Sequence, residues 1–371
     1  MIYFDNAATT PLTPTVIAAM TEALETSYGN PSSLHSYGRK AKQLLRTYRS
    51  AIARCLETSE SHIIFTSGGT ESNNTAIIGY ALANQDKGRH LITSATEHHS
   101  VLHAMSYLES RFHFDVTYLQ PIHQQISAQQ VQEALRSDTI LVSIMHANNE
   151  TGDLNPISEI GQVLSTHQAA FHVDAVQTLG KIPVLPDQWQ IDFLSASAHK
   201  FHGPKGVGLL YAKPLVFDKL LHGGDQENKR RASTENMPSL AGMSTALIES
   251  VENMAASYQK VSQCREALLT GLDGTDYYIN ANQESLPHVL NIGFPGVDNG
   301  LLLTQLDLAG FAVSTGSACT AGAVTPSHVL TSYYGKQSPR LKESIRISFS
   351  DQNTPEQARL LAQKLKELLK K

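Results

Sequence analysis

The sequence predicts an α/β fold: a large domain with a mostly parallel seven-stranded sheet covered by helices, and a smaller α+β domain. Short β-rich runs alternate with helical patterns of roughly 10 to 17 residues, which is typical of parallel strands joined by crossover helices. This alternation ends near Lys213, and a helix-rich stretch follows it. The last part of the chain mixes a few strands with helices, which indicates a second domain.

The first expected helix begins at Thr13-Pro14, an N-cap followed by proline at the first helical position, and ends at about Ser27. Turn residues over 28–33 break it, and an amphipathic helix is expected over about 37–56. Seven β-rich runs then supply the strands of the large sheet, at residues 62–66, 90–93, 116–119, 140–145, 170–173, 193–196 and 207–211.

The second region begins after a helix-rich stretch at about 239–272. A capping box at Thr354, with proline at the next position, predicts where the last helix begins. We expect strands at 288–294 and 344–349, and helices near 299–308, 326–332 and 355–369. We assign residues 13–258 to the large domain, and residues 1–12 and 259–371 to the small domain, which carries a mobile cysteine loop at about 314–325.

Composition excludes several function classes. The 371 residues are 41% hydrophobic and 17% charged, and the net charge of -5 argues against direct nucleic-acid binding. No stretch approaches the roughly 18 apolar residues of a membrane span, and the N-terminus does not resemble a secretion signal. We therefore expect no membrane association and a cytoplasmic location. Three widely spaced cysteines predict neither a disulfide framework nor a zinc ribbon, and we expect no metal site.

Lys200 lies among small neighbours. Residues 195–208 around it are rich in serine, alanine and glycine, and the apolar run 207–211 follows. A flat ligand can lie directly against such a lysine, and a lysine amine becomes a nucleophile when desolvation or a nearby cation lowers its pKa. The alternative is a surface lysine in a glycine-rich turn.

A glycine-rich turn, SGGTES at 67–72, separates an expected strand from an expected helix. Glycines such as Gly69 allow close approach of the backbone, and the helix N-terminus at Thr70 offers unpaired N–H groups, which makes the turn a candidate phosphate cradle. It is not a Walker loop, because no Gly-Lys-Ser/Thr follows. A plain strand–turn–helix connection is the alternative.

Asp174 ends another apolar run, at the sheet edge where ligands bind in open α/β folds. A carboxylate there can hold a protonated ring nitrogen, and Gln177 can reach the same ligand. The alternative is a carboxylate that only caps a helix.

His98 follows a further strand and can stack on a flat ligand and transfer protons. Metal binding by His99 and His103 is the other interpretation, but nothing nearby completes a ligand set.

Cys319 is the one reactive residue in a run of small residues at 314–323. Such a run packs poorly into a core, and a cysteine on an exposed loop is a candidate nucleophile. Cys55 and Cys264 lie in helical patterns with apolar neighbours and are expected to be packing residues. A lysine, a phosphate cradle, a carboxylate, an imidazole and a thiol together indicate the chemistry of pyridoxal 5'-phosphate (PLP).

The order and wording of these motifs closely resemble the cysteine desulfurases, which are class V of the fold-type-I PLP-dependent enzymes. The loop sequence Gly-Ser-Ala-Cys-Thr is similar to that of the IscS/NifS branch. The resemblance covers nearly the whole chain and rests on YFDNAATT at 3–10, GNPSS at 29–33, SGGTES at 67–72, TEH at 96–98, HANNETG at 146–152, HVDAVQ at 172–177, HK at 199–200, SACT at 317–320 and SIR at 344–346.

The resemblance implies a role for each matched residue at the cofactor. Lys200 would form the Schiff base, Asp174 would pair with the ring nitrogen, Gln177 would hydrogen-bond the ring hydroxyl, and His98 would stack on the ring and assist proton transfer. The phosphate would be held by Gly69, Thr70, Ser197 and His199, together with Thr234 of the other subunit of a homodimer.

The resemblance also implies the substrate and the product. Asn30, Asn149 and Arg346 would hold the carboxylate of L-cysteine, and Asn149 would also contact the cofactor. Cys319 would take the sulfur as a persulfide and leave L-alanine. The persulfide would pass to an acceptor protein, a tRNA-thiolation enzyme or an iron–sulfur scaffold. Relatives that serve a scaffold can carry a longer C-terminal tail than this sequence, which favours tRNA or cofactor thiolation.

Two other functions remain open from the sequence. Another class V enzyme, such as an aminotransferase, would not need Cys319. A catalytically weakened PLP-binding partner protein is suggested by Asp225 and Ser233, which stand where the family commonly has glycine.

Overall fold

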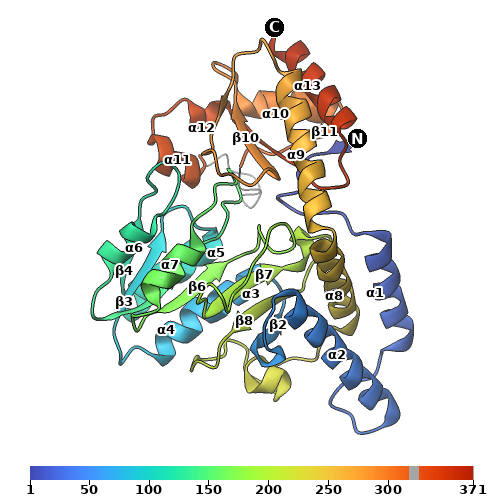
Figure 1. Ribbon diagram of the computed structural model, residues 1–371, viewed down its shortest axis with the longest axis vertical. Coiled ribbons are helices and arrows are strands. Elements are labelled where there is room, and N and C mark those ends of the chain that lie inside the picture. The colour runs from blue at the N-terminus through green and yellow to red at the C-terminus, as the bar shows by residue number, and fades with distance from the viewer. Residues whose placement is uncertain (317–325, 371) are drawn as a thin grey trace.

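The structure of the protein is a computed structural model that describes residues 1–316 and 326–370. Its largest element is a seven-stranded sheet with the strand order β2-β8-β7-β6-β5-β3-β4 (Figure 1). The strands are β2 (Ile63–Thr66), β3 (His90–Ser94), β4 (Asp115–Leu119), β5 (Thr139–Ser143), β6 (Ala170–Asp174), β7 (Phe193–Ser197) and β8 (Gly208–Ala212). Neighbours from β7 to β4 are parallel, and β8 runs antiparallel to both β7 and β2. The predicted sheet is confirmed, with a strand at each of the seven predicted places.

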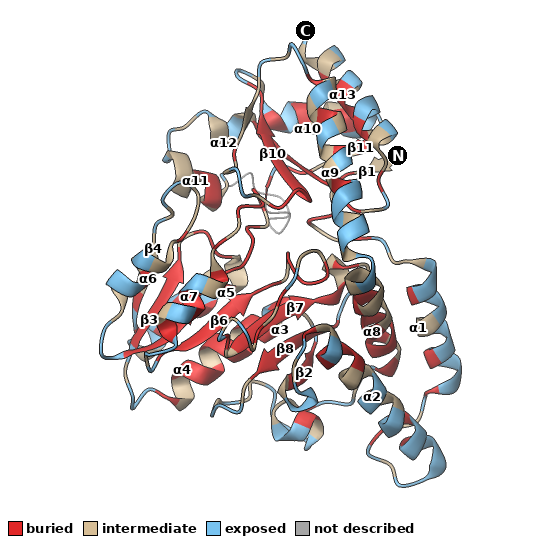
Figure 2. Ribbon diagram, in the orientation of Figure 1, coloured by how far each residue is buried: buried red, intermediate tan, exposed pale blue. Residues whose placement is uncertain are grey.

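Both faces of this sheet are covered by helices, and the central strands are buried along their whole length (Figure 2). Alternate residues therefore enter two separate cores: Leu209 and Tyr211 of β8 lie in one, and Leu210 and Ala212 lie in the other. The covering helices are α1 (Pro14–Thr26), α2 (Ser36–Cys55), α3 (Gly69–Asn74), α4 (Tyr80–Ala83), α5 (His99–Phe112), α6 (Ala128–Ala134), α7 (Ile157–Leu164) and α8 (Met237–Glu252).

Local sequence explains where these helices begin. Thr13 accepts a hydrogen bond from the Val16 N–H at 3.2 Å and caps α1 as predicted. The short helix α3 continues through a π-helical turn (Thr75–Gly79) into α4. Three 3₁₀ turns complete this part of the chain: Glu60–His62, Ala198–Lys200 and Gln226–Lys229.

The C-terminal part forms a second body above the sheet in Figure 1, and both chain ends lie there. Its strands are β9 (Tyr278–Ile279), β10 (Val289–Gly293) and β12 (Ser344–Ser348), which form an antiparallel sheet in the order β12-β10-β9. A parallel pair of two-residue strands joins β1 (Ile2–Tyr3) to β11 (Phe311–Ala312). The helices are α9 (Met254–Gly271), α10 (Asn299–Leu308), α11 (His328–Tyr334), α12 (Arg340–Glu343) and α13 (Pro355–Leu369).

A third core fills this second body, and it includes Phe4 from the N-terminus together with residues of α9, β10, β12 and α13. The division into residues 13–258 on one side and residues 1–12 with 259–371 on the other stays a prediction. The capping box at Thr354 is present. Helix α11 begins two residues later than predicted, because Ser327 is its N-cap and accepts from the Leu330 N–H at 3.0 Å.

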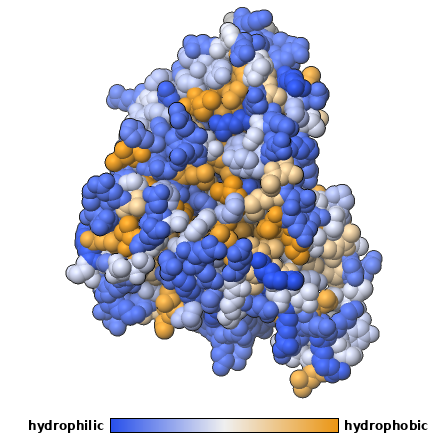
Figure 3. All heavy atoms as spheres, viewed as in Figure 1, coloured by the Kyte–Doolittle hydropathy of each residue, from blue (hydrophilic) through white to orange (hydrophobic). Residues whose placement is uncertain are grey.

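Hydrophilic residues cover most of the face seen in Figure 3, and apolar residues gather near its middle. Among the described residues, no helix is long and apolar enough to cross a membrane. Cys264 is fully buried in the third core and Cys55 is half-buried at the end of α2, as expected for packing residues. Cys319 lies outside the described residues.

Candidate active site

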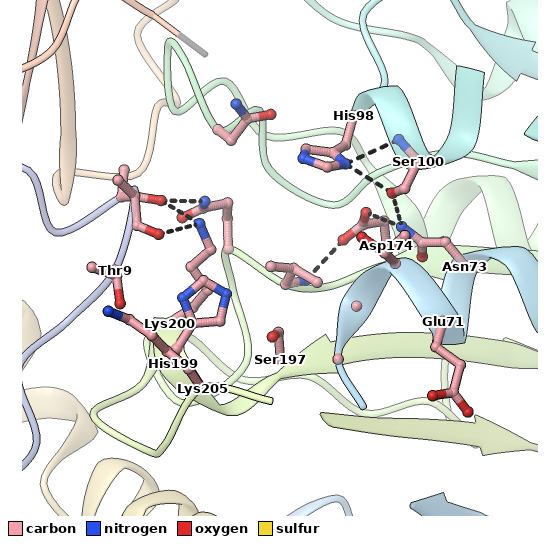
Figure 4. Close-up of a pocket in the computed structure, with 18 of the residues that line it drawn as sticks. Thr9, Glu71, Asn73, His98, Ser100, Asp174, Ser197, His199, Lys200 and Lys205 are labelled. Carbon is pink, nitrogen blue, oxygen red and sulfur yellow. Dashed lines mark hydrogen bonds between the residues drawn. The ribbon is translucent and has the colours of Figure 1, made fainter. Parts of the chain in front are cut away.

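A cavity of about 430 Å³ opens where β6 and β7 end and α3 begins (Figure 4). This is the carboxyl edge of the parallel strands, where ligand sites of α/β sheets form. The cavity brings together ten of the predicted site residues from distant parts of the chain: Gly69, Thr70, His98, Asn149, Asp174, Gln177, Ser197, His199, Lys200 and Arg346.

Lys200 ends the 3₁₀ turn that directly follows β7, so a rigid element positions it. Its Nζ atom donates to the carbonyl oxygens of Ala7 and Ala8, at 2.6 and 2.9 Å. The N-terminal segment therefore forms one wall of the cavity and directs the lysine amine. Lys200 is half-buried and lines the cavity, and its role as the cofactor lysine stays a prediction.

Asp174 is the last residue of β6, and its carboxylate is fixed from two sides. One oxygen accepts from Asn73 Nδ2 at 2.7 Å, and the other accepts from the Val176 N–H at 3.0 Å. Asp174 is 4% exposed and lies in the cavity wall. It can hold a protonated ring nitrogen, because each carboxylate oxygen accepts more than one hydrogen bond.

The side chain of Gln177 has a defined orientation. Its Nε2 atom donates to the Ala7 carbonyl at 3.0 Å, and its Oε1 atom accepts from Lys181 Nζ at 3.3 Å. Because a carbonyl can only accept and an ammonium can only donate, these partners distinguish the amide nitrogen from the oxygen. Burial, with the nearby charges of Lys200 and Arg346, lowers the pKa of Lys181 to about 7.

His98 caps α5, and its Nδ1 atom accepts from the Ser100 N–H at 3.1 Å. In the neutral ring the proton therefore sits on Nε2. Burial lowers the pKa of His98, an effect that Asp174 opposes and Lys200 reinforces. The imidazole is therefore mainly neutral near pH 7. Figure 4 shows it beside Asp174 in the cavity wall.

The predicted phosphate cradle lies at the start of α3, opposite the end of β7. Gly68 has φ of +151°, and a Cβ atom on Gly69 would lie 2.7 Å from Val176, so larger residues do not fit this turn. Ser197 lines the cavity beside these glycines. Burial, followed by the charges of Lys200, Lys205 and Lys181, lowers the pKa of His199 to about 4, so its ring is neutral at pH 7.

Arg346 comes from β12 of the second body and is only 1% exposed. Its NH2 group pairs with Asp5 at 2.9 Å, and its NH1 group donates to the Asn149 carbonyl at 2.9 Å. Asn149 and Arg346 are thus joined at the cavity, as a shared substrate-binding role requires. Each terminal nitrogen of the guanidinium carries two N–H groups, and Nε has no partner among the described residues, so Arg346 keeps donors for a carboxylate.

Three predicted residues are not in this cavity. Asn30 and Thr234 are exposed and do not line it, and Cys319 lies outside the described residues. The loop that carries Thr234 is nevertheless tied to the cradle, because Arg231 binds Glu71 through Nε at 2.8 Å and through NH2 at 3.1 Å.

Several residues that complete the site were not predicted. Asn73 orients Asp174, and its position three residues after Thr70, on the same face of a helix, was a usable signal. The carbonyl groups of Ala7 and Ala8 have no signal of their own, since every residue has a carbonyl. Among the described residues, no group of three or more His, Cys, Asp or Glu side chains is arranged to hold a metal ion, so the His99 and His103 pair is not part of one.

The cavity suits a polar aromatic phosphate ester such as PLP. Buried polar atoms are normally hydrogen-bonded. Four such atoms in cavity-lining residues have no hydrogen-bond partner within residues 1–316 and 326–370: Thr9 Oγ1, Asn73 Oδ1, His199 Nδ1 and Arg346 Nε. Together with the lysine, the carboxylate and the glycine cradle, these atoms match the donors and acceptors of the cofactor and of an amino-acid substrate.

Comparisons with known proteins agree with this fit. The family description Aminotransferase class-V matches residues 2–361. A Bacillus subtilis (strain 168) protein, provisionally named cysteine desulfurase IscS 1, is 48% identical over 375 residues that cover 100% of this chain and 99% of the relative. A solved NifS-like protein has a TM-score of 0.92 at 35% identity, over 100% of this chain and 99% of that one. A solved structure of SspA in complex with cysteine has a TM-score of 0.84 at 37% identity, over 94% and 99%.

A match over nearly the whole chain, on a fold with this cavity, makes the protein a class V enzyme with PLP as its cofactor. Within that class, the chain belongs to the cysteine desulfurase family of IscS and NifS type.

Proposed function

We propose that this enzyme removes sulfur from L-cysteine, releases L-alanine and holds the sulfur as a persulfide on Cys319. The observation that carries the proposal is the cavity in which Lys200, Asp174 and His98 meet Arg346. The first three suit the cofactor, and Arg346 suits the carboxylate of an amino acid. The relatives named cysteine desulfurases, and the SspA structure that contains cysteine, support this substrate.

Each residue has a physical task. Lys200 would hold PLP covalently, the cradle from Gly68 to Thr70 would bind the phosphate with Ser197 and His199, and Asp174 would keep the ring nitrogen protonated. The bound cofactor supplies an electron sink for the reacting amino acid. Lys200 and neutral His98 stand where protons can move at the substrate, since both line the cavity.

The transfer of sulfur to Cys319 needs no oxidant or reductant besides the thiolate and the substrate. The thiolate of Cys319 attacks the substrate sulfur, so an S–S bond forms while the C–S bond breaks, and its electron pair stays on carbon. A proton then reaches that carbon and completes L-alanine. Free thiols have a pKa near 8.5, so only a few per cent of Cys319 is thiolate at pH 7 unless its site lowers the pKa.

We further propose a homodimer with composite sites. Asn30 is exposed and outside its own cavity, and large apolar side chains flank it: Tyr28 is 70% exposed, Leu34 is 90% exposed and Tyr37 is 53% exposed. Apolar side chains gathered in this way are typical of an interface. A second copy that covers them would also bring Thr234 to its partner's phosphate, as the family resemblance implies.

Subunit complementation tests the composite site. Lys200→Ala protein and Thr234→Ala protein, each inactive or weak alone, should regain activity after mixing and refolding, because one site in the mixed dimer is intact. A mixture of Lys200→Ala protein with Asp174→Asn protein should give no comparable gain in activity. Lys200 and Asp174 of one chain belong to the same site, so each site of the mixed dimer would carry one of the two substitutions. Equal behaviour of the two mixtures would contradict shared sites.

We propose a cytoplasmic enzyme that passes sulfur to an acceptor protein, either a tRNA-thiolation enzyme or an iron–sulfur scaffold. The chemistry supports an acceptor, because the persulfide must be discharged before the next turnover. The activity itself is tested by measuring alanine and sulfide from L-cysteine with a thiol reductant. The wild type should release both in equal amounts, and Lys200→Ala should release neither. Alanine formation only with added pyruvate, and without release of sulfide, would instead indicate an aminotransferase.

A further inference from the structure

Glu150 lies beside the residues that flank segment 317–325 on either side. It belongs to the loop between β5 and α7 and is completely buried. On one side is Gly316, where a Cβ atom would lie 3.1 Å from Glu150 Oε2. On the other side is Ser327, whose hydroxyl donates a short hydrogen bond to the same oxygen. One carboxylate of the large-sheet region thus accepts a hydrogen bond from Ser327 and lies beside the backbone of Gly316, the two residues that flank the segment containing Cys319.

The loop that carries Glu150 is itself held firmly. The Glu150 N–H donates to Asn148 Oδ1 at 2.8 Å, and Asn148 Nδ2 donates to the Thr96 carbonyl at 3.0 Å. The Glu150 carbonyl accepts from Asn291 Nδ2 of β10 at 3.1 Å. The carboxylate therefore has a fixed position relative to both bodies of the protein.

His328 extends the contact toward the cavity. Its Nε2 atom donates to the Glu97 carbonyl at 2.9 Å, directly before His98, and its Nδ1 atom lies 4.0 Å from Glu150 Oε1. The residue that follows Ser327 is therefore bound to the backbone that also positions the catalytic histidine. Segment 317–325 is therefore flanked by Gly316 and His328, and the structure describes the surroundings of both residues.

The burial of the Glu150 carboxylate requires a compensating interaction. Burying such a group is unfavourable unless charges or hydrogen bonds compensate it, and the ion pair found for Glu150 in the described part of the chain is the 4.0 Å approach of His328. Its Oε1 atom has no hydrogen-bond partner among the described residues. An apolar residue of similar size would fill the space without this desolvation, so what the carboxylate specifically contributes is the hydrogen bond with Ser327 and the approach to His328.

We infer that Glu150 is a positioning residue for the sulfur-transfer step: its hydrogen bond with Ser327, beside Gly316, holds the chain that flanks the Cys319 segment. This inference rests on the proposed role of Cys319. Losing the anchor should slow the attack of the thiol on the substrate sulfur, because misplacement of a reacting group by about 1 Å can reduce a rate about a hundredfold. Binding of cofactor and cysteine should persist, since Glu150 does not line the cavity.

The test compares Glu150→Ala with Glu150→Gln in the PLP-loaded enzyme. Glutamine keeps an oxygen that can accept from Ser327, so it should remain within about threefold of the wild type. Alanine should slow single-turnover persulfide formation on Cys319 about tenfold or more. In both variants, the cysteine concentration that half-saturates the change in cofactor absorbance should be unchanged. Equal rates for Glu150→Ala and the wild type would overturn the inference, and so would a Gln variant as slow as the Ala variant.

Ser327 provides a second pair of variants should Glu150→Ala fold poorly. Ser327→Ala should slow persulfide formation, and Ser327→Thr, which keeps the hydroxyl, should restore it. Ser327 also caps α11, so a control must remove a different cap: Asp298→Ala removes the N-cap of α10, where Asp298 accepts from the Leu301 N–H at 2.9 Å. That control should transfer sulfur at the wild-type rate. A Ser327→Ala protein no slower than the Asp298→Ala protein would refute the anchor.

Cys319→Ala, measured alongside, separates the two claims. If Cys319→Ala still transfers sulfur, the proposed function fails in its present form. If Cys319→Ala is inactive and Glu150→Ala is as fast as the wild type, only the positioning role fails.

Discussion

Lys200 Nζ donates to the carbonyl oxygen of Ala7 at 2.6 Å, although the two residues are 193 positions apart. The same carbonyl accepts from Gln177 at 3.0 Å. The N-terminal segment thus directs two residues assigned to the cofactor. Because this segment also packs into the third core through Phe4, the second body helps to shape the site formed by the large sheet.

Lys200 should be the one attachment point of PLP. Reduction of the loaded enzyme with borohydride, followed by peptide mapping, should place the cofactor on Lys200. The matched control is Lys181, whose pKa burial lowers to about 7. Lys181→Ala should keep the visible absorbance of bound PLP, and Lys200→Ala should lose it. Cofactor found on Lys181 in the wild-type protein would contradict the assignment.

Asp174→Asn should fold normally but turn over about a hundredfold more slowly, since it removes one preorganised charge from the reacting ring. Asn73→Ala should have a smaller effect in the same direction, because Asn73 only orients the carboxylate. Steady-state kinetics together with melting temperatures check this order. Unchanged turnover of Asp174→Asn with cofactor still bound would reduce Asp174 to a structural cap.

Ser233 has φ of +102°, in a region that favours glycine. Ser233→Gly should therefore raise the free energy of unfolding by about 1 kcal/mol. The same change at Ser262, within α9, should lower it by about 0.5 kcal/mol, because glycine weakens a helix more than serine does. Denaturant unfolding measures both, and a destabilised Ser233→Gly protein would disprove strain at this position.

Acid should destabilise the protein partly through His172. Burial lowers its pKa to about 3, while its two nitrogens lie 2.7 Å from Ser143 Oγ and 3.0 Å from Ser195 Oγ. The pKa is depressed in the folded state, so this contribution is complete above the unfolded pKa of about 6.5 and is lost as pH falls toward 3. Between pH 7 and about pH 4.5 the loss is about 2 to 3 kcal/mol.

His172→Gln can keep both serine contacts without titrating, so its stability should fall less over the same pH interval. His113→Asn, an exposed position, serves as the control and should follow the wild type. Parallel losses in all three proteins would show that His172 does not contribute to the acid sensitivity.

Periodicity and capping residues predicted the seven strands and the bounds of α10 and α13, because those signals are local. The two-residue strands β1 and β11 were missed, since two residues carry no pattern. Motifs predicted which residues line the site, but they did not predict which of these residues bind one another. The pairing of Arg346 with Asp5, 341 positions away, and the meeting of Gly316 and Ser327 at Glu150 depend on how the two bodies pack, which no local signal encodes.

The proposed reaction depends most on Cys319 as the sulfur acceptor, and isotope labelling tests that role directly. The loaded enzyme is incubated with ³⁵S-labelled L-cysteine, the free thiols and persulfides are alkylated, and the peptides are examined by mass spectrometry. We predict that labelled persulfide appears on the peptide that contains Cys319, with matching release of alanine, and not on those of Cys55 or Cys264, whose thiol pKa values burial raises. Alanine release with no label on Cys319, or full sulfur transfer by Cys319→Ala, would contradict the account.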